Sequence, residues 1–222
     1  MSMTAIGTTR IGILGAGRVG TGLARALAAA GHDVTLGHRR PPETSAADAT
    51  GSARPIRHAD QRTTAATTDV VVNATPGDSA LARLSALDGE LAGKILVDVS
   101  NATRHDPDGL PSDLCYPGSS LAERLQQALP ATRVVKTLNT MLFTVMTDPA
   151  ALATPPTVFL SGDDAHAKTV TEGLLADLGW RPEWIEDLGG IATARATEAA
   201  VLLVPHVLRR HGLKPFAVSL AR

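Results

Sequence analysis

A glycine-rich turn near the N-terminus constrains the fold of this chain more than any other feature. Residues 10–20 read Arg-Ile-Gly-Ile-Leu-Gly-Ala-Gly-Arg-Val-Gly, so a short apolar run leads into the pattern G-x-G-x-x-G. In such a turn the first glycine allows the tight bend, the second lets the main chain approach a pyrophosphate, and the third lets the next helix pack closely on the strand. We therefore expect Gly15, Gly17 and Gly20 to form a dinucleotide-binding turn.

The residues around the turn fit this interpretation better than a purely structural loop. The run Ile11–Leu14 predicts a buried strand, and apolar residues recur at helical spacing from Val19 to Ala30, where Gly31 ends the pattern. A strand, a glycine turn and a helix in this order are the context that the motif requires. The N-terminus of that helix would face the phosphates with its unpaired N–H groups.

The end of the second predicted strand indicates which nucleotide is bound. After Asp33–Leu36 the chain continues with Gly37, His38, Arg39 and Arg40, where an NAD-preferring protein usually presents an acidic residue. An arginine fork binds a phosphate through paired, charge-assisted hydrogen bonds, whereas a carboxylate would repel it. We expect NADP(H) as the cofactor; the alternative is that the two arginines form an ordinary solvated surface pair.

The rest of the chain alternates predicted strands with predicted helices. We expect a short helix over residues 43–53, a poor third strand over 54–56, and further strands over 69–75, 94–100, 133–138 and 157–161. This alternation predicts an α/β fold with a Rossmann-type, doubly wound parallel sheet. The expected domains are an NADP-binding Rossmann domain over residues 8–186 and a small C-terminal helical extension over 187–222.

Polar residues follow several of these strands at the point where each one ends. Ligands of doubly wound sheets bind outside the carboxyl ends of the strands, so polar side chains there are candidates for the site. The candidates at this edge are Thr75, Pro76, Asn101, Asn139 and Thr140.

Composition excludes several classes of protein. The 222 residues carry 21 basic and 22 acidic side chains, and 3% are aromatic, which argues against a nucleic-acid partner. One cysteine, Cys115, permits neither an internal disulfide nor a multi-cysteine metal site, and we expect no metal. No stretch is expected to reach the length of a membrane span, and we expect a cytoplasmic protein without a membrane partner.

The C-terminal region predicts a helix from about residue 191 to 211 that is kinked near Pro205. Its apolar stripe exceeds what a lone exposed helix usually carries, so we expect it to pack over the sheet or to form a homodimer. Arg195 and Glu198 stand at helical spacing and are expected to form a local ion pair.

A carbonyl or imine substrate would need a proton donor, and the chain offers few. The candidates are Lys136, Asn139, Thr140, His206 and Cys115. Lys136 is expected either to point into the cleft or to extend its stem to solvent, and His206 and Cys115 are interpreted as a helix-end cation and a passive thiol.

A set of motifs along the chain resembles the coenzyme F-420-dependent NADP oxidoreductase family and the related reductase domain of the STEAP metalloreductases. Beyond the glycine turn, the motifs lie at residues 22–24, 38–40, 97–101, 135–140, 160–164 and 187–195. The resemblance implies a Rossmann domain whose small C-terminal part helps to hold a second redox partner, a deazaflavin or a flavin, against the nicotinamide.

The resemblance also implies roles for individual residues. Gly15, Gly17, Arg18, Val19 and Gly20 would bind the pyrophosphate, and His38, Arg39 and Arg40 the 2′-phosphate. Thr75 and Pro76 would lie on the nicotinamide side, and Asn139 and Thr140 would flank the site of hydride transfer.

Three functions remain open. The first is hydride transfer between NADPH and coenzyme F-420 or a flavin such as FMN, which depends mainly on positioning two rings. The second is NADPH-dependent reduction of a small carbonyl or imine compound. The third is a non-catalytic NADP(H)-binding regulator, which would keep the glycine turn and Arg39 but block the nicotinamide face.

Overall fold

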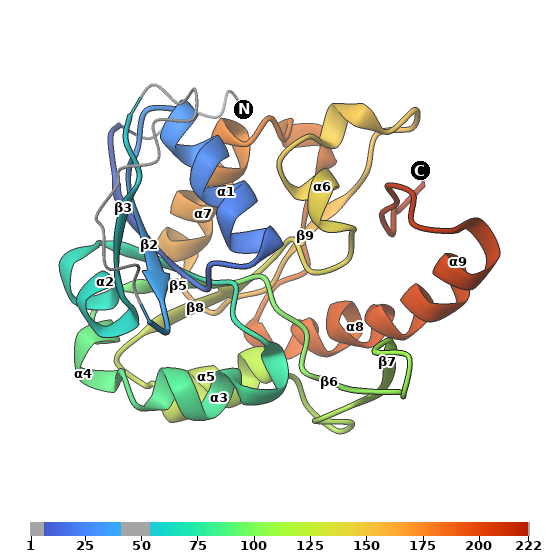
Figure 1. Cartoon of the computed structure of the whole chain (residues 1–222), viewed down its shortest axis with the longest axis horizontal. Coiled ribbons are helices and arrows are strands. Elements are labelled where there is room, and N and C mark those ends of the chain that lie inside the picture. Colours follow the sequence, from blue (N-terminus) through green and yellow to red (C-terminus); the bar gives the residue numbers. More distant parts are fainter. Residues whose placement is uncertain (1–6, 41–53, 222) are drawn as a thin grey trace.

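A parallel sheet forms the centre of the molecule. The computed structural model describes residues 7–40 and 54–221, and within these ranges six parallel strands lie in the order β3-β2-β1-β4-β5-β8 (Figure 1). Their bounds are β1 Arg10–Leu14, β2 Asp33–His38, β3 Arg57–Asp60, β4 Val70–Asn73, β5 Ile95–Asp98 and β8 Arg133–Lys136. The chain moves outward from β1 in both directions, which is the topology of a doubly wound sheet. The predicted Rossmann-type fold is therefore confirmed.

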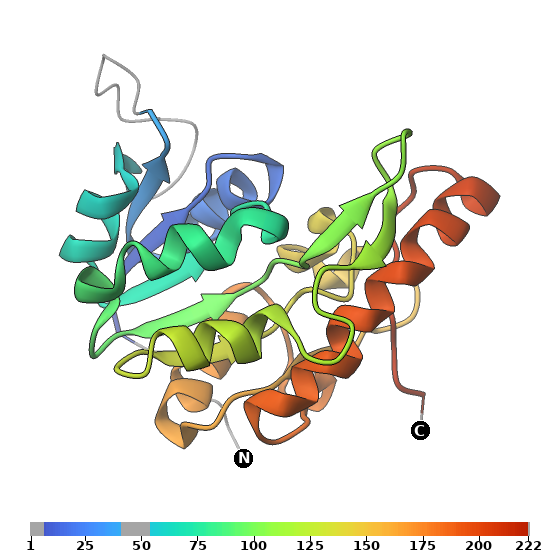
Figure 2. The ribbon, with the colours of Figure 1, turned by 90° about the horizontal axis from the view of Figure 1, so that it is seen from below.

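Helices cover both faces of this sheet, as Figures 1 and 2 show. One face is covered by α1 Arg18–Ala29, α6 Phe143–Met146 and α7 Ala165–Asp177. The other is covered by α2 Gln61–Thr67, α3 Gly77–Ser85, α4 Asp88–Leu91 and α5 Leu121–Ala128. A parallel sheet needs both faces covered, which explains why its central strands are apolar throughout.

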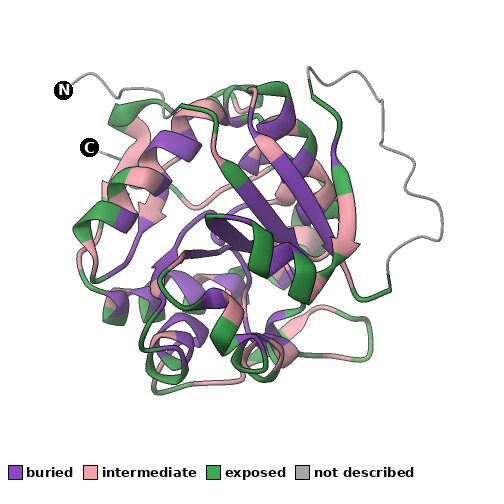
Figure 3. Ribbon diagram, turned by 90° about the vertical axis from the view of Figure 1, so that its left-hand side faces the viewer, coloured by how far each residue is buried: buried purple, intermediate pink, exposed green. Residues whose placement is uncertain are grey.

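The two hydrophobic cores follow from the alternation of side chains along each strand. Ile11 and Ile13 pack with Leu23 of α1, whereas Val71 and Leu96 pack with Leu84 and its neighbours on the opposite face. Successive side chains of a strand point to opposite faces, so one strand contributes to both cores. Figure 3 shows the central strands as buried along most of their length.

Several smaller elements surround the sheet. A hairpin is formed by β6 Thr103–His105 and β7 Pro111–Leu114, and a separate parallel pair by β9 Val158–Leu160 and β10 Ile185–Asp187. Two single-turn helices lie at Pro149–Ala151 and Pro182–Trp184. The sequence did not predict the hairpin, and the helix expected over residues 43–53 lies outside the described residues.

The C-terminal region is a broken helical run. It consists of the single turn Ile191–Thr193, α8 Ala194–Ala199, a second tight turn Ala200–Leu203, and α9 Val204–His211. Pro205 stands in the first turn of α9, where its missing N–H leaves no helical hydrogen bond unmade. The sequence predicts a kink near this proline, and the structure has the tight turn Ala200–Leu203 directly before α9. The division into domains at residue 186 stays a prediction.

This run also corrects an expectation about membranes. By length and composition, the segment Ile191–His211 is long and apolar enough to cross a membrane, so the expectation that no stretch reaches that length was wrong. Leu203 is 53% exposed, which shows that part of the apolar surface faces outward. Glu198 in the same segment is buried against the rest of the fold.

The end of the chain returns to the sheet. Beyond α9, the main-chain N–H of Val218 donates to the carbonyl of Thr140 at 2.9 Å, and the N–H of Leu142 donates to the carbonyl of Phe216 at 2.9 Å. These bonds attach the tail to the loop that follows β8. The carboxyl edge of the sheet is therefore bordered by the C-terminal region, and the candidate site lies at this edge.

Candidate active site

A groove of about 720 Å³ lies over the glycine turn at the carboxyl edge of the sheet. It is lined by Gly15, Ala16, Gly17, Arg18, Val19, Arg39, Gln61, Ala74, Thr75, Pro76, Arg83, His105 and Phe143. The groove brings together residues that follow β1, β2 and β4, which are neighbours in the sheet but lie far apart in the sequence. Seven of the sequence-predicted site residues are in its wall: Gly15, Gly17, Arg18, Val19, Arg39, Thr75 and Pro76.

Two glycines of the turn have no room for a side chain. Gly15 has a φ of +111°, and a Cβ there would lie 2.5 Å from the carbonyl oxygen of Ala74. A Cβ on Gly20 would lie 1.8 Å from the carbonyl oxygen of Gly15. Both obstacles are main-chain atoms, so neither can rotate away. The close approach of α1 to the turn therefore depends on Gly20, and the close approach of the turn to Ala74, after β4, depends on Gly15.

Gly17 differs, because a Cβ there would meet no protein atom within 4 Å. Its φ of −82° is open to any residue, so the protein does not need glycine here for its own fold. The space beside Gly17 belongs to the groove, at the N-terminus of α1. That is where a pyrophosphate binds in this class of turn, because the first N–H groups of the helix are unpaired.

We expect Gly17→Ala to separate cofactor binding from stability. The substitution should leave the thermal unfolding midpoint unchanged and weaken NADPH binding by about tenfold, because the new methyl group occupies the path of the pyrophosphate. Fluorescence titration with NADPH and a thermal unfolding scan measure the two quantities. A variant that binds NADPH as tightly as the parent would contradict the placement of the pyrophosphate.

Of the three basic residues at the end of β2, only one lines the groove. The side chain of Arg39 lines it, whereas His38 and Arg40 do not. His38 Nε2 instead forms a 2.7 Å hydrogen bond with Nδ1 of His58 on β3. Burial and the neighbouring His58 lower the pKa of His38, so the ring is mainly neutral at pH 7. Arg39 is thus the residue of this segment that presents positive charge to the groove.

A second cavity of about 360 Å³ adjoins the groove. The two share the wall formed by Val19, Ala74, Thr75, Pro76, His105 and Phe143. The rest of the second cavity is mainly apolar, with Val99, Met141, Leu142, Met146, Val204 and Phe216 beside the polar residues Asp78, Ser100, Asn101 and Asn139. The guanidinium of Arg18 stacks 5.1 Å from the ring centre of Phe143, where the two hollows meet.

Asn139 and Asn101 form a reciprocal pair in the wall of this cavity. Asn139 Nδ2 donates to Oδ1 of Asn101 at 2.9 Å, and Asn101 Nδ2 donates to the carbonyl of Asn139 at 2.8 Å. Leu138, directly before Asn139, has a φ of +60°, a left-handed conformation that is strained for a residue with a side chain. This sharp turn after β8 allows Asn139 to reach back across the end of β5.

Thr140 does not line either hollow. It is buried, and its Oγ1 has no hydrogen-bond partner in the described structure, while its carbonyl accepts from the C-terminal tail. Of the two residues expected to flank hydride transfer, the structure therefore places Asn139 in the cavity wall and Thr140 behind it. Two other sequence candidates, Cys115 and His206, also lie outside both hollows, and burial raises the pKa of the Cys115 thiol.

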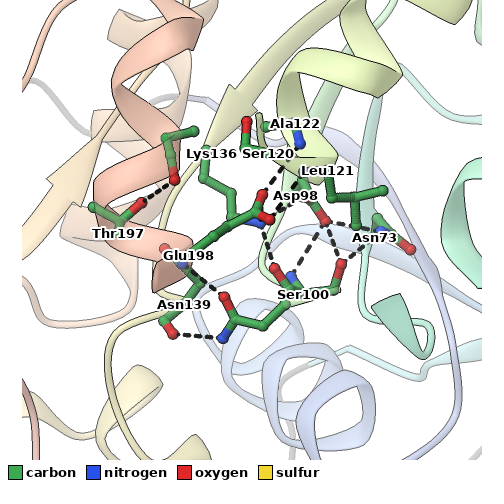
Figure 4. Close-up of polar contacts among 12 residues, drawn as sticks. Asn73, Asp98, Ser100, Ser120, Leu121, Ala122, Lys136, Asn139, Thr197 and Glu198 are labelled. Carbon is green, nitrogen blue, oxygen red and sulfur yellow. Dashed lines mark hydrogen bonds and ion pairs between the residues drawn. The ribbon is translucent and has the colours of Figure 1, made fainter. Parts of the chain in front are cut away.

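The sequence led us to expect Lys136 in the cleft or in solvent, but it is almost completely buried. Figure 4 shows its polar contacts. Its ammonium donates to Asp98 Oδ2 at 2.8 Å and to the carbonyl of Ser100, and it forms an ion pair with Glu198 Oε1 at 2.8 Å. Burial lowers the pKa of Lys136, but the carboxylates of Asp98 and Glu198 outweigh it and the net shift is upward. Lys136 therefore stays protonated near neutral pH, and it lines neither hollow.

Asp98 extends this network toward the shared wall of the two hollows. Its Oδ1 accepts from Asn73 Nδ2 at 2.8 Å and from Ser100 Oγ at 2.7 Å. Asn73 Oδ1 in turn accepts from the hydroxyl of Thr75 at 2.7 Å. Asn73, Asp98 and Lys136 are the last residues of three adjacent strands and pair side by side in the sheet. Thr75 and Ser100 are thereby held in fixed positions.

Glu198 and Arg195 do not form the local ion pair expected from their spacing. Glu198 contacts Lys136 and accepts from the main-chain N–H groups of Leu121 and Ala122 at 2.9 and 3.2 Å. Arg195 instead pairs with Glu123, its Nε lying 2.8 Å from Oε2. Residues three apart on a helix are neighbours, but each of these side chains has another partner: Lys136 of β8 for Glu198, and Glu123 of α5 for Arg195.

Sequence reasoning missed several residues that line the site. Gly77, at the start of α3, has no room for a Cβ, which would lie 2.1 Å from the carbonyl of Asn101. Gln61, Arg83 and His105 line the groove but belong to no recognisable motif. The signal for the buried network was present, because three of the predicted strands end in polar residues.

The residues of the groove fit NADP(H). A 2′-phosphorylated dinucleotide requires three features that the groove has: an open space at Gly17, two glycines without room for a side chain, and an arginine beyond β2. Thr75 and Pro76 border both hollows, so a nicotinamide ring beside them would face the second cavity.

Comparison with known proteins agrees with this geometry. Residues 10–102 match the model of the family described as NADP oxidoreductase, coenzyme F-420-dependent. A solved structure from Arthrobacter sp. FB24, which carries the provisional name of an F-420-dependent NADP reductase, is 37% identical with a TM-score of 0.83. The likeness covers 96% of this chain and 100% of that one.

Two further proteins are similar. One is matched over only part of its own length, and the other shares the fold at low sequence identity. The metalloreductase STEAP3 of Rattus norvegicus is 30% identical over 197 residues, which is 87% of this chain and 36% of that protein. The chain thus spans about a third of the length of this curated relative. The pyrroline carboxylate reductase of Plasmodium falciparum, solved with NADP bound, shares the fold at 13% identity with a TM-score of 0.60, covering 92% of this chain and 67% of that one.

The full-length likeness to the Arthrobacter protein and the match to the family model agree with the glycine turn and with Arg39 in the groove. The chain belongs to the coenzyme F-420-dependent NADP oxidoreductase family.

Proposed function

We propose that this protein transfers a hydride between NADPH and a deazaflavin, coenzyme F-420, or a flavin such as FMN. The observation that carries the proposal is the pair of adjoining hollows that share the wall at Thr75 and Pro76. One hollow has the features of a dinucleotide site, and the other is an apolar space beside the expected position of the nicotinamide. NADPH would supply the hydride, and the protein would supply the alignment of two rings.

The second cavity suits a flat, weakly polar ring system. Met141, Phe143 and Phe216 offer apolar and aromatic surface, and the amides of Asn101 and Asn139 offer hydrogen bonds at one side. Asn139 is held by Asn101 and by the strained turn at Leu138, so its side chain has a fixed direction. We assign to Asn139 the role of orienting the second ring. Thr140 would act from behind the wall, through the position of Asn139.

The burial of Lys136 and the amides that border the second cavity favour a ring acceptor over a carbonyl compound. A carbonyl that accepts hydride develops charge on oxygen and needs a donor, and Lys136 is sealed in an ion-paired network. The amides that border the cavity can hold a ring by hydrogen bonds without giving up a proton. Reduction of a carbonyl or imine remains the second candidate, because His105 borders both hollows.

A direct assay tests the proposal. Purified protein and NADPH are mixed in turn with coenzyme F-420, FMN, a simple aldehyde and a cyclic imine, and NADPH oxidation is followed by absorbance. We expect turnover with F-420 or FMN. Turnover with the aldehyde or imine alone would replace the proposal with the second candidate. Tight NADPH binding without any turnover would contradict it and favour a regulator. The homodimer and the cytoplasmic location stay predictions.

A further inference from the structure

The ion pair between Lys136 and Glu198 lies outside both hollows, and the proposed hydride transfer makes no direct use of it. Both side chains are almost fully buried, with exposed fractions of 1% and 4%. Burying charges costs several kcal/mol for each ion, so such a pair is retained only where its hydrogen bonds are complete. Here all three N–H groups of the ammonium have partners: Asp98, Ser100 and Glu198.

Glu198 joins three separate parts of the molecule. It stands on α8, contacts the end of β8 through Lys136, and accepts hydrogen bonds from the first N–H groups of α5, at Leu121 and Ala122 (Figure 4). One ammonium faces two carboxylates, which leaves one negative charge in excess. The positive end of the α5 dipole offsets this charge. Glu198 is therefore held in one position by partners from two elements.

The segment that starts at Glu198 continues into the wall of the second cavity. Val204 and Phe216 line that cavity, and both follow Glu198 along the chain. Beyond them, the main chain at Phe216 and Val218 bonds to Leu142 and Thr140 in the loop after β8. The chain from Glu198 to Val218, which carries this wall, is thus attached at both ends. At its start Glu198 pairs with Lys136 of β8, and at its end main-chain bonds join it to the loop after β8.

We propose that Lys136 and Glu198 are positioning residues for the second substrate: their ion pair sets the place of the wall that carries Val204 and Phe216. The inference rests on the proposed function, because it names the residues that shape the site of the second ring. Neither residue touches that ring. When the pair is weakened, the wall moves away from Asn101 and the cavity widens, whereas the glycine turn and Arg39, which belong to other elements, keep their positions.

Glu198→Gln is the first test, since it keeps the volume and leaves Lys136 paired with Asp98. Its matched control is Arg195→Gln, which breaks the ion pair to Glu123. That pair also joins α8 to α5, but the Arg195 side chain is 55% exposed. Glu198→Gln should raise the KM for F-420 or FMN by about tenfold, the equivalent of one well-made hydrogen bond, and leave the Kd for NADPH within twofold. Arg195→Gln should change neither value.

A second variant keeps the inference testable where Glu198→Gln does not fold. Phe216→Ala shortens the wall itself at a partly exposed position, and it should raise the same KM while leaving NADPH binding unchanged. The inference is overturned by an unchanged KM in Phe216→Ala or in folded Glu198→Gln, by an equal loss of NADPH affinity, or by an equal effect of Arg195→Gln.

Hydrogen exchange separates this inference from the proposed function. In Glu198→Gln, the amides of α9 should exchange about tenfold faster than in the parent, while those of α1 should not change. This measurement needs no turnover. A parent protein that reduces neither F-420 nor FMN would defeat the proposed function, and unchanged exchange in α9 would defeat the positioning role.

Discussion

Replacing Gly20 with alanine is expected to abolish NADPH binding and to destabilise the protein strongly. The new Cβ would lie 1.8 Å from the carbonyl oxygen of Gly15 and 3.3 Å from a methyl group of Ile13. The helix must then move away from the strand. Overpacking of this kind costs about 3 kcal/mol or more. For a chain of this size, that loss lowers the unfolding midpoint by about 10 °C. Calorimetry and an NADPH titration measure the two effects.

The same helix provides a matched control. Gly22 lies two residues further along α1, and a Cβ there would meet no atom within 4 Å. Because alanine favours a helix over glycine, Gly22→Ala should stabilise the protein by about 0.5–1 kcal/mol. Its NADPH affinity should stay at the parent value. If both variants behave alike, the close contact between α1 and the turn at Gly15 does not exist in solution.

Replacing Arg39 with aspartate is expected to change the choice between the two nicotinamide cofactors. The guanidinium lines the groove at the end of β2, where a 2′-phosphate would lie. Its loss removes charge-assisted hydrogen bonds, and the new carboxylate repels the phosphate, so the combined cost is about 4 kcal/mol. NADPH affinity should fall by about a thousandfold and NADH affinity should change little. Separate titrations of the two cofactors give the ratio.

Charge reversal at a remote arginine serves as the control for this prediction. Arg181 lies over the ring of Trp184 at 5.0 Å and lines neither hollow. Arg181→Asp changes the net charge of the protein by the same amount, so a general electrostatic effect would appear in both variants. Equal losses of NADPH and NADH affinity in Arg39→Asp would refute the assignment of the 2′-phosphate to this residue.

Much of the fold could be predicted because its signals are local. The apolar runs that became β4, β5 and β8 are long enough for one strand and end at polar residues, and the helices between them make the sheet parallel. The hairpin of β6 and β7 was missed, since its strands are short and mostly polar. Its place depends on contacts with α3 and with the C-terminal run rather than on its own sequence.

The glycine turn was also readable, because Gly15 and Gly20 answer constraints of the main chain itself. The half of the site that forms the second cavity could not be predicted from the sequence. Lys136 could be placed on a strand but not beside Asp98 and Glu198, and the apolar wall at Phe216 gives no pattern that links it to Asn139. His38 was placed at the phosphate, yet the structure pairs it with His58 of the next strand.

The sequence alone determined the doubly wound sheet, the glycine turn and the arginine beyond the second strand. The first two follow from apolar periodicity and from the conformational freedom of glycine within a few residues, and the arginine follows from its place directly after the second strand. Only the tertiary structure decided which charges are buried and what encloses the second cavity. Lys136 meets Asp98 across 38 residues, and Glu198 meets Leu121 across 77. Such contacts are set by the packing of whole elements, so no local pattern specifies them.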